Sequence, residues 1–286
     1  MVITGKTLVC GIIGDPVEHS LSPVIHNAAF EELNIDCVYI PFRVLTQSLG
    51  VAVCGLQSLR VLGFNVTVPH KVEVIKHLHS LSALARRIGA VNTVLNAKEG
   101  LIGYNTDALG ATEALRQSGV HLNDSAFTIL GAGGAARAIV FALAKISQRI
   151  VVLNRTVEKA QKLRQDVKRK LRKDIEVGPL TEKSLAKTLP TTDVLLNATS
   201  VGMDDHPKRF PFKQMDLTPA LTVFDIVYSL SESELLGKAR QSGCKTISGI
   251  EMLLHQGAAA FQIWTGRKAP LEVMRNALAE ARAEGD

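Results

Sequence analysis

Cysteine, aromatic residues and long hydrophobic runs are all scarce in this sequence, and each shortage excludes a class of protein. The 286 residues include four cysteines and one tryptophan, and 5% of the chain is aromatic. The cysteines form no C-x-x-C pair, which excludes a cysteine zinc site and a disulfide framework, so we expect buried thiols in a reducing compartment. No apolar run approaches the roughly 18 residues of a membrane-spanning helix, and the N-terminus lacks a signal-peptide pattern. We therefore expect a cytoplasmic protein without a membrane partner.

Histidine offers no metal site either. Among the eight histidines the only close pair is His77 and His79, and residues two positions apart on a helix do not face each other. We therefore expect no bound metal.

The excess of positive charge lies in one short segment. The chain has 33 basic and 27 acidic side chains, a net charge of +6. Seven of the basic residues and one acid lie in segment 162–173, and the rest of the chain is balanced. A basic nucleic-acid-binding domain is therefore not indicated, and a solvated helix face is the simplest interpretation of this segment. Nucleic-acid binding by the segment stays as an alternative. The seven residues are Lys162, Arg164, Lys168, Arg169, Lys170, Arg172 and Lys173.

Short apolar runs alternate with helix-length amphipathic stretches, which is typical of α/β proteins with parallel, doubly wound sheets. With 46% hydrophobic residues the chain is long enough for two such domains. A helix is expected to begin with Ser22 as its N-cap and Pro23 as its first residue. In the first hundred residues we predict strands at 8–14, 37–44, 63–68, 91–97 and 101–105.

The second half repeats the alternation around a glycine-rich turn. We predict, in order, FTILGAGG, a helix to Ala144, RIVVLNRT, the basic helix, VLLNATS, TVFDIVYS, CKTISG and closing helices near 250–264 and 270–284. The predicted domains are residues 1–108 with 250–286, and residues 109–249, with the C-terminal helices packing on the first domain.

The glycine turn predicts a dinucleotide site. Gly131, Gly133 and Gly134 follow an apolar strand and open an alanine-rich helix, whose N-terminus offers free N–H groups to a pyrophosphate. The next strand ends in Asn154, Arg155 and Thr156, where an NAD enzyme usually carries an acid. Because a guanidinium can pair with a 2′-phosphate that an acid would repel, NADP is the expected cofactor.

Polar residues at strand ends of the first half form the candidate reaction centre. Each has a plain structural explanation when it is taken alone: a helix cap, a turn residue or an exposed lysine. Their joint appearance before a Rossmann-like half favours a catalytic role. These candidates are Ser20, Ser22, Asn65, Thr67, Lys71, Asn92 and Asp107.

Nine stretches from residue 12 to residue 266 carry, in order, a resemblance to the shikimate and quinate dehydrogenase family. They are IIGDPVEHSLSPVIHNAAF, GFNVTVPHK, IGAVNTV, GYNTDALG, ILGAGGAARA, VVLNRT, LLNATSVGM, FDIVY and GIEMLLHQGAAAFQIWTG. The resemblance implies an N-terminal substrate-binding domain, a Rossmann-like NADP-binding domain, and reversible NADPH-dependent reduction of 3-dehydroshikimate to shikimate in aromatic amino-acid biosynthesis.

The resemblance also assigns residues to roles. Lys71 and Asp107 would be the catalytic pair. The substrate would be bound by Ser20, Ser22, Thr67, Lys71, Asn92, Asp107, Tyr228 and Gln256. The cofactor would be bound by Gly131, Ala132, Gly133, Gly134, Ala135, Asn154, Arg155, Thr156, Ile226 and Gly249.

One departure from the family pattern follows Tyr228. Relatives usually continue with Asn-Pro and a Thr-Pro-Leu-Leu turn, whereas this chain reads YSLSESELL and lacks both prolines. The departure puts the choice between shikimate and quinate in doubt, although the presence of both motif serines, Ser20 and Ser22, favours shikimate. A broad-specificity quinate/shikimate dehydrogenase using NAD or NADP, and a non-catalytic NADP sensor, stay as alternatives. A homodimer is also left open.

Overall fold

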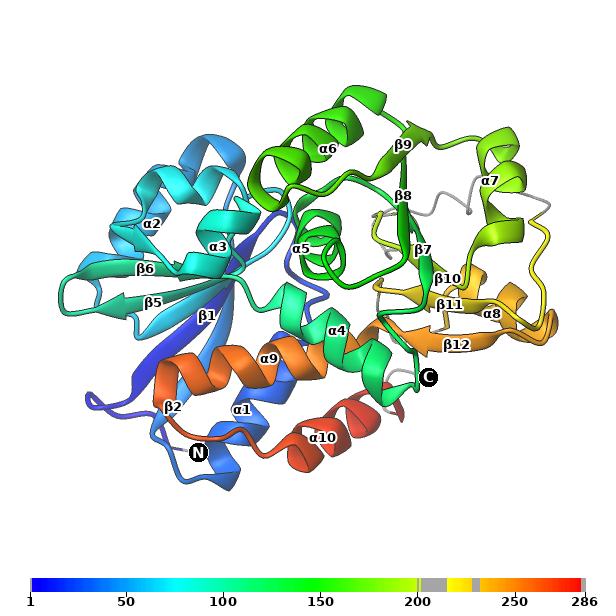
Figure 1. The fold of residues 1–286 in the computed structure, drawn as a ribbon. Coiled ribbons are helices and arrows are strands. Elements are labelled where there is room, and N and C mark those ends of the chain that lie inside the picture. The colour runs from blue at the N-terminus through cyan, green and yellow to red at the C-terminus, as the bar shows by residue number, and fades with distance from the viewer. Residues whose placement is uncertain (1, 200, 202–214, 228–231, 284–286) are drawn as a thin grey trace. The chain divides into compact units, whose positions relative to one another are not determined.

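The chain divides into two compact units in the computed structural model, which describes residues 2–199, 201, 215–227 and 232–283. Unit 1 consists of Met1–Gly110 and Leu253–Asp286, and unit 2 of Ala111–Met252. Each unit contains its own six-stranded sheet with helices, so the α/β fold class is confirmed (Figure 1).

Unit 1 begins with alternating strands and helices, where α denotes α-helices and η short 3-10 helices. Its N-terminal elements are β1 (Leu8–Gly14), α1 (Ser22–Glu32), β2 (Cys37–Arg43), η1 (Thr46–Ser48), α2 (Leu49–Ser58), β3 (Gly63–Val66), η2 (Glu73–His77), β4 (Ser80–Leu81), α3 (Ala83–Ile88), β5 (Thr93–Ala97) and β6 (Gly100–Tyr104). Helix α4 (Asp107–Gln117) leads into unit 2.

The sheet of unit 1 has the strand order β2-β1-β3-β5-β6-β4. Strands β2, β1 and β3 are parallel, but β5 is antiparallel to both β3 and β6. The prediction of a wholly parallel sheet is therefore wrong for this unit. Strands β5 and β6 are joined by a two-residue turn, a connection that only antiparallel neighbours can use.

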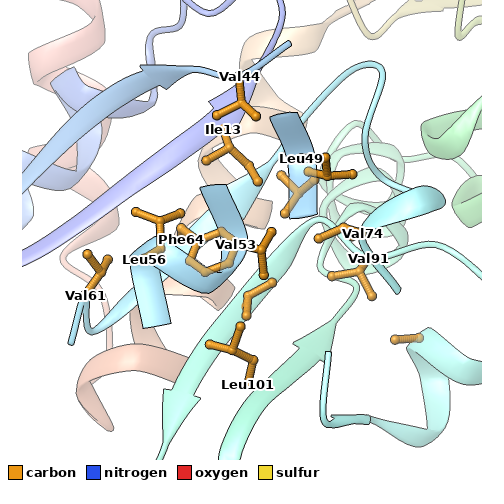
Figure 2. Packing of buried hydrophobic residues seen from close by; sticks show 13 residues of the cluster. Ile13, Val44, Leu49, Val53, Leu56, Val61, Phe64, Val74, Val91 and Leu101 are labelled. Carbon is orange, nitrogen blue, oxygen red and sulfur yellow. The ribbon is translucent and has the colours of Figure 1, made fainter. Parts of the chain in front are cut away.

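The core on one side of this sheet is a cluster of thirteen buried apolar residues (Figure 2). They come from strands, from α2, η2 and α3, and, at Val44, Val61 and Val91, from connecting segments. The short helical segments are therefore held by burial of apolar area rather than by their own hydrogen bonds. The cluster consists of Ile13, Val44, Leu49, Val53, Leu56, Val61, Phe64, Val66, Val74, Ala85, Val91, Val94 and Leu101.

Two C-terminal helices, α9 (Gly249–Thr265) and α10 (Leu271–Ala283), complete unit 1, which confirms that the C-terminal helices return to the first domain. Helix α10 packs beside α1 (Figure 1). Helix α9 approaches α1 closely at Gly257, where an added Cβ would lie 2.6 Å from the Cδ1 atom of Ile25. The rings of Phe30 and Phe261 pack at 5.3 Å between centroids.

Unit 2 has a wholly parallel sheet in the order β12-β11-β10-β7-β8-β9. The strand order reverses between β7 and β10, the point at which doubly wound sheets bind ligands. Its elements are β7 (Ala126–Leu130), α5 (Gly134–Leu143), β8 (Arg149–Asn154), α6 (Val157–Leu171), β9 (Glu176–Pro179), α7 (Glu182–Thr188), η3 (Leu189–Thr191), β10 (Val194–Asn197), β11 (Thr222–Asp225), α8 (Glu234–Gln241) and β12 (Lys245–Ser248).

Two local predictions are wrong. Ser22 is the first residue of α1 rather than its N-cap, since the cap position is Leu21, which makes no side-chain capping bond. Three cysteines are buried as expected, but Cys54 is exposed because it lies on the outer face of α2. All four cysteines are free thiols.

In the described part of the chain, no helix combines the length and the apolar character that crossing a membrane requires. The same residues contain no group of three or more His, Cys, Asp or Glu side chains arranged to hold a metal ion.

Candidate active site

Sheet geometry brings the polar candidates of unit 1 to one edge. Strands β1, β3 and β6 end at this edge, and β5 begins there because it runs antiparallel to β3 and β6. The segments that leave or enter the sheet here therefore carry Ser20, Thr67, Asn92 and Asp107. Four motifs far apart in sequence thus reach the same edge of the sheet.

Lys71 and Asp107 form the central ion pair of this edge. The Nζ atom of Lys71 donates to Oδ2 of Asp107 at 2.6 Å, and the two side chains are 14% and 4% exposed. The peptide of Lys71 is also fixed, because its carbonyl accepts the N–H of Val91 at 2.7 Å. A nearly buried ammonium held beside a carboxylate can donate a proton to an oxygen that gains negative charge.

Asn92 connects this pair to its surroundings. Its Oδ1 atom accepts the backbone N–H of Thr106 at 2.7 Å, and since a backbone N–H can only donate, this bond fixes which end of the amide is which. Its Nδ2 atom donates to Oδ1 of Asp107 at 2.9 Å and to Oε1 of Gln256 at 3.2 Å. Asp107 therefore receives the lysine on one oxygen and the amide on the other.

Gln256 joins the site from the far end of the chain. It lies on α9, within unit 1, and its Nε2 atom donates to the carbonyl of Leu253 at 3.1 Å. The hydroxyl of Thr106 donates to Oε1 of Gln256 at 3.4 Å. The structure therefore brings Lys71, Asn92, Asp107 and Gln256 together in one hydrogen-bonded group.

Ser20, Ser22 and Thr67 lie at the same edge but outside this group. The Oγ atom of Ser20 accepts the N–H of Ser22 at 3.3 Å. The methyl group of Thr67 packs against Gly14, where an added Cβ would lie 2.3 Å from it. Within the described residues no hydrogen bond joins these three side chains to Lys71 or Asp107.

The glycine turn of unit 2 joins β7 to α5 at the point where strand order reverses. Gly131 has a φ of +106°, and a Cβ there would lie 2.7 Å from the carbonyl oxygen of Ala198, so only glycine fits. A Cβ on Gly133 would meet no atom within 4 Å. The N-terminus of α5 has no side-chain cap, so its N–H groups and the open space beside Gly133 fit a pyrophosphate.

Asn154, Arg155 and Thr156 lie next to this turn. Leu130 and Leu153 are register partners on β7 and β8, so the residues that follow both strands are neighbours. Nδ2 of Asn154 donates to the carbonyl of Thr156 at 2.8 Å, which shapes the turn, and Arg155 is exposed. No acidic residue stands at this strand end, so the donor set fits a 2′-phosphate better than a free ribose hydroxyl.

The remaining cofactor candidates meet at the neighbouring strand ends. A Cβ on Gly249 would lie 2.5 Å from the carbonyl oxygen of Ile226, so these two residues are in contact across β11 and β12. Tyr228 lies outside the described residues, together with Ser229, Leu230 and Ser231. The rest of the stretch that departs from the family pattern is described, and there Ser233 caps the start of α8, where its side chain accepts the N–H of Leu236.

Two supporting residues of this edge, Asn197 and Asp225, were missed by the sequence analysis. Oδ1 of the buried Asp225 accepts from Nδ2 of Asn197 at 2.9 Å and from the N–H of Val227 at 3.1 Å, and Oδ2 accepts from the Ser233 hydroxyl at 2.7 Å. Burial raises the pKa of Asp225 to about 6, although these hydrogen bonds lower it. The signal in the sequence was a charged residue inside the apolar run TVFDIV.

Family models match nearly three quarters of the chain in three consecutive parts. Residues 12–94 match the shikimate dehydrogenase substrate binding domain, residues 112–203 match shikimate / quinate 5-dehydrogenase, and residues 249–279 match the shikimate 5'-dehydrogenase C-terminal domain.

Individual relatives match over almost the whole length. The shikimate dehydrogenase (NADP(+)) of Methanocaldococcus jannaschii is 43% identical over 279 residues, which is 97% of this chain and 98% of that protein. A crystal structure of a shikimate dehydrogenase in complex with NADP+ matches with a TM-score of 0.88 and 40% identity, over 98% of this chain and 97% of that one. The shikimate 5-dehydrogenase of Listeria monocytogenes, solved with shikimate and NAD, matches with a TM-score of 0.85 and 36% identity, over 97% and 98%.

Proposed function

Because the chain belongs to the shikimate/quinate dehydrogenase family, we propose that it is an oxidoreductase that catalyses the reversible, NADP-dependent reduction of 3-dehydroshikimate to shikimate in aromatic amino-acid biosynthesis. The observation that carries this proposal is the buried Lys71–Asp107 pair, bound at its second carboxylate oxygen by Asn92. Unit 1 would be the substrate-binding and catalytic domain, and unit 2 the NADP-binding domain.

In this mechanism Lys71 acts as the proton donor. Bound NADPH would supply the hydride to the ketone carbon. The ammonium of Lys71 hydrogen-bonds to the ketone oxygen, stabilises the negative charge that develops there and then transfers its proton. In the reverse direction the neutral amine takes the proton from the substrate hydroxyl.

Asp107 keeps the ammonium oriented. Its Oδ2 atom already accepts from Lys71, and in the complex it also accepts a hydrogen bond from the substrate hydroxyl. Asn92 and Gln256 supply neutral donors and acceptors suited to ring hydroxyls, with Thr67 beside them, and Ser20 with Ser22 would bind the carboxylate. A site that satisfies ring hydroxyls rejects analogues without them, because its buried polar groups would be left unpaired.

The cofactor candidates of unit 2 fit NADP through three features: the uncapped start of α5, the open side of Gly133 and the exposed Arg155. Backbone N–H groups would bind the pyrophosphate and the guanidinium would pair with the 2′-phosphate. The four free thiols fit a reducing, cytoplasmic location, which is part of the proposal together with small-molecule ligands as the binding partners.

A broad-specificity quinate/shikimate dehydrogenase is the second candidate. It is favoured by the Listeria monocytogenes relative that was solved with NAD in place of NADP. Steady-state assays of shikimate and quinate, each with NADP and with NAD, distinguish the two. We expect the highest kcat/KM for shikimate with NADP. Equal or better turnover of quinate with NAD would overturn the narrower assignment.

Substitution of the lysine tests the mechanism. We expect Lys71→Ala to lower kcat by about two decades or more while NADP binding is nearly unchanged, because a general acid contributes about 10²-fold to 10⁴-fold. Stopped assays give kcat, and fluorescence titration gives the NADP affinity. Lys76→Ala is the matched control, since Lys76 pairs on the surface with Glu73. A near-normal rate for Lys71→Ala would remove the lysine from the mechanism.

A further inference from the structure

Asn92 is held in place by buried hydrogen bonds to residues other than the catalytic pair. Asn65, on β3, donates from Nδ2 to the carbonyl of Asn92 at 3.0 Å and to the hydroxyl of Thr93 at 3.1 Å. That hydroxyl donates in turn to Oδ1 of Asn92 at 3.1 Å. Asn65 therefore controls both the main chain and, through Thr93, the side chain of Asn92.

The orientation of Asn65 is determined by its partners. Since the carbonyl of Asn92 can only accept, the atom of Asn65 beside it must be the amide nitrogen, and the oxygen must point the other way. This Oδ1 atom accepts the phenol O–H of Tyr39 at 2.7 Å. Asn65 is 4% exposed and Tyr39 is 1% exposed, so water cannot easily replace either partner.

Tyr39 is itself firmly anchored on the edge strand β2. Its outward-facing N–H and C=O would otherwise have no partner in the sheet, and both bind the side-chain amide of Asn27, at 2.7 and 3.0 Å. Its ring stacks on His26 at 4.5 Å between centroids and lies 6.0 Å from the ring of Trp264. The phenol oxygen is therefore fixed by α1 on one side and by α9 on the other.

We propose that Tyr39 and Asn65 are positioning residues for the reaction, which act through Asn92 to hold Asp107 in place beside Lys71. The inference rests on the proposed function. The contacts run from the Tyr39 hydroxyl to the Asn65 amide, which binds the carbonyl of Asn92 directly and its Oδ1 atom through the Thr93 hydroxyl. The Nδ2 atom of Asn92 then donates to Oδ1 of Asp107. A shift of the Asn92 amide moves the carboxylate that orients the proton donor, and small misplacements in such pairs slow the chemical step.

The first test is Tyr39→Phe, which removes one hydroxyl and keeps the ring packing. Asn65 Oδ1 would then lose its donor and remain a buried acceptor without a partner, which weakens the hold of Asn65 on Asn92. We expect kcat for shikimate oxidation to fall about tenfold, KM for NADP to stay within twofold, and Tm to fall by a few degrees. Tyr104→Phe is the matched control, because Tyr104 lies on β6 of the same sheet and its hydroxyl is not a member of this chain of bonds; its kcat should equal that of the wild type.

The second test is a double-mutant cycle with Asn92→Ala. If Tyr39 acts through the Asn92 side chain, Tyr39→Phe should change kcat less than twofold in the Asn92→Ala background. If Tyr39 had a purely structural role, Tyr39→Phe would lower Tm, and its effect on kcat would be the same with and without the Asn92 side chain. The proposal would be overturned if the kcat losses of Tyr39→Phe and Asn92→Ala multiplied in the double variant. It would also be overturned if Tyr39→Phe alone had the kcat of the wild type.

The third test uses Thr93, so that a folding defect in Tyr39→Phe cannot decide the outcome. Thr93→Val keeps the side-chain shape and removes the hydroxyl, and Thr93→Ser restores it. We expect about a tenfold loss of kcat for the valine variant and recovery to within twofold for the serine variant. Equal activities of the two variants would contradict the proposal.

A wild-type protein that does not turn over shikimate with NADP would overturn the proposed function itself, whereas an active wild type with unaffected variants would overturn only the positioning role.

Discussion

At the scale of single residues, most of the candidate site could be predicted from short motifs, but the side chains that hold those residues could not. Lys71, Asn92 and Asp107 were predicted because each stands just beyond an apolar run, and strand ends of α/β sheets carry functional groups. Asp225 interrupts the apolar run TVFDIV, but it was missed because its partner Asn197 lies 28 residues away in the sequence.

Arg155 gives the sharpest residue-scale prediction for cofactor choice. Because its guanidinium is expected to pair only with the 2′-phosphate, Arg155→Ala should raise KM for NADP about tenfold or more and leave KM for NAD within twofold. Steady-state titrations with both cofactors measure the difference. Lys183→Ala, which removes an exposed cation from α7 of the same unit, is the control of equal charge. Equal changes for both cofactors would show that Arg155 does not recognise the 2′-phosphate.

Asp225 makes the stability of unit 2 depend on pH. Its folded-state pKa of about 6 lies above the ordinary value of 3.8, so the folded form binds the proton more tightly. This contribution is fully present below pH 3.8 and is lost as pH rises through 6. Asp225→Asn imitates the neutral form, because an amide can still accept from Asn197 and Val227 while its N–H groups face Ser233.

We therefore expect Asp225→Asn to stabilise the protein by up to about 3 kcal/mol at pH 7.5 and by much less at pH 4.5, since one pKa unit corresponds to about 1.4 kcal/mol. Urea unfolding followed by circular dichroism at the two pH values measures this. Glu182→Gln, an exposed carboxylate in the same unit, is the control. The prediction would be contradicted if the free energy of unfolding changed with pH to the same extent in Asp225→Asn and in the wild type.

At the scale of helices and strands, long periodic segments were predicted well and short edge elements were not. The closing helices, expected near 250–264 and 270–284, are confirmed at Gly249–Thr265 and Leu271–Ala283. Strands β4 and β9 were missed because they have two and four residues and no fully buried side chain. The antiparallel direction of β5 was missed because an apolar run contains no information about strand direction.

The basic helix α6 is partly neutralised by its neighbours. Asp166 pairs with Arg137 at 2.6 Å and with Arg169 at 2.7 Å, and Arg164 pairs with Asp174, whose pKa is held at about 2 by that hydrogen bond. Partial burial, together with Arg137, lowers the pKa of Lys170. The helix still carries a net positive charge, so its local field should attract an anionic cofactor.

Neutralising three of its residues tests this field. We expect the combined variant Lys168→Gln, Arg169→Gln and Lys170→Gln to slow NADP association several-fold at low salt and to have little effect at high salt, because screening removes long-range attraction. Stopped-flow fluorescence at two ionic strengths measures the rates. The control removes the same charge from exposed residues of unit 1, Lys6, Arg60 and Lys98. If both triple variants changed the rate of NADP association equally, the basic segment would have no specific role in attracting NADP and would be only a solvated helix face.

At the scale of the whole molecule, the two units have separate cores, and a tryptophan provides a fluorescent probe of the core of unit 1. Its only tryptophan, Trp264, is buried in unit 1 and donates to the carbonyl of Val94 at 2.9 Å. A Cβ on Gly63 would lie 2.3 Å from the Trp264 ring. Tryptophan fluorescence therefore reports the unfolding of unit 1, whereas circular dichroism reports both units.

Gly63→Ala should consequently destabilise unit 1 by about 2 kcal/mol, through overpacking at this contact. We expect the fluorescence transition to move down by about 5 °C and the dichroism curve to broaden into two steps. Gly131→Ala is the corresponding variant in unit 2 and should lower the affinity for NADP. It should also lower the midpoint of the circular-dichroism transition and leave the midpoint of the fluorescence transition unchanged. Coincident shifts of both signals in both variants would show that the units unfold as one.

The discontinuity of unit 1 sets an order of events during synthesis. Unit 2 lies between the two parts of unit 1 in the sequence, so at about 5–20 residues per second the ribosome spends roughly seven to thirty seconds on it before the rest of α9 is made. During that time Asn92 has no Gln256, and the carbonyl of Val94 has no Trp264. Unit 2 has then been made, whereas the proposed acid–base site of unit 1 still lacks Gln256, which binds Asn92, so this site is the last part of the molecule to be completed.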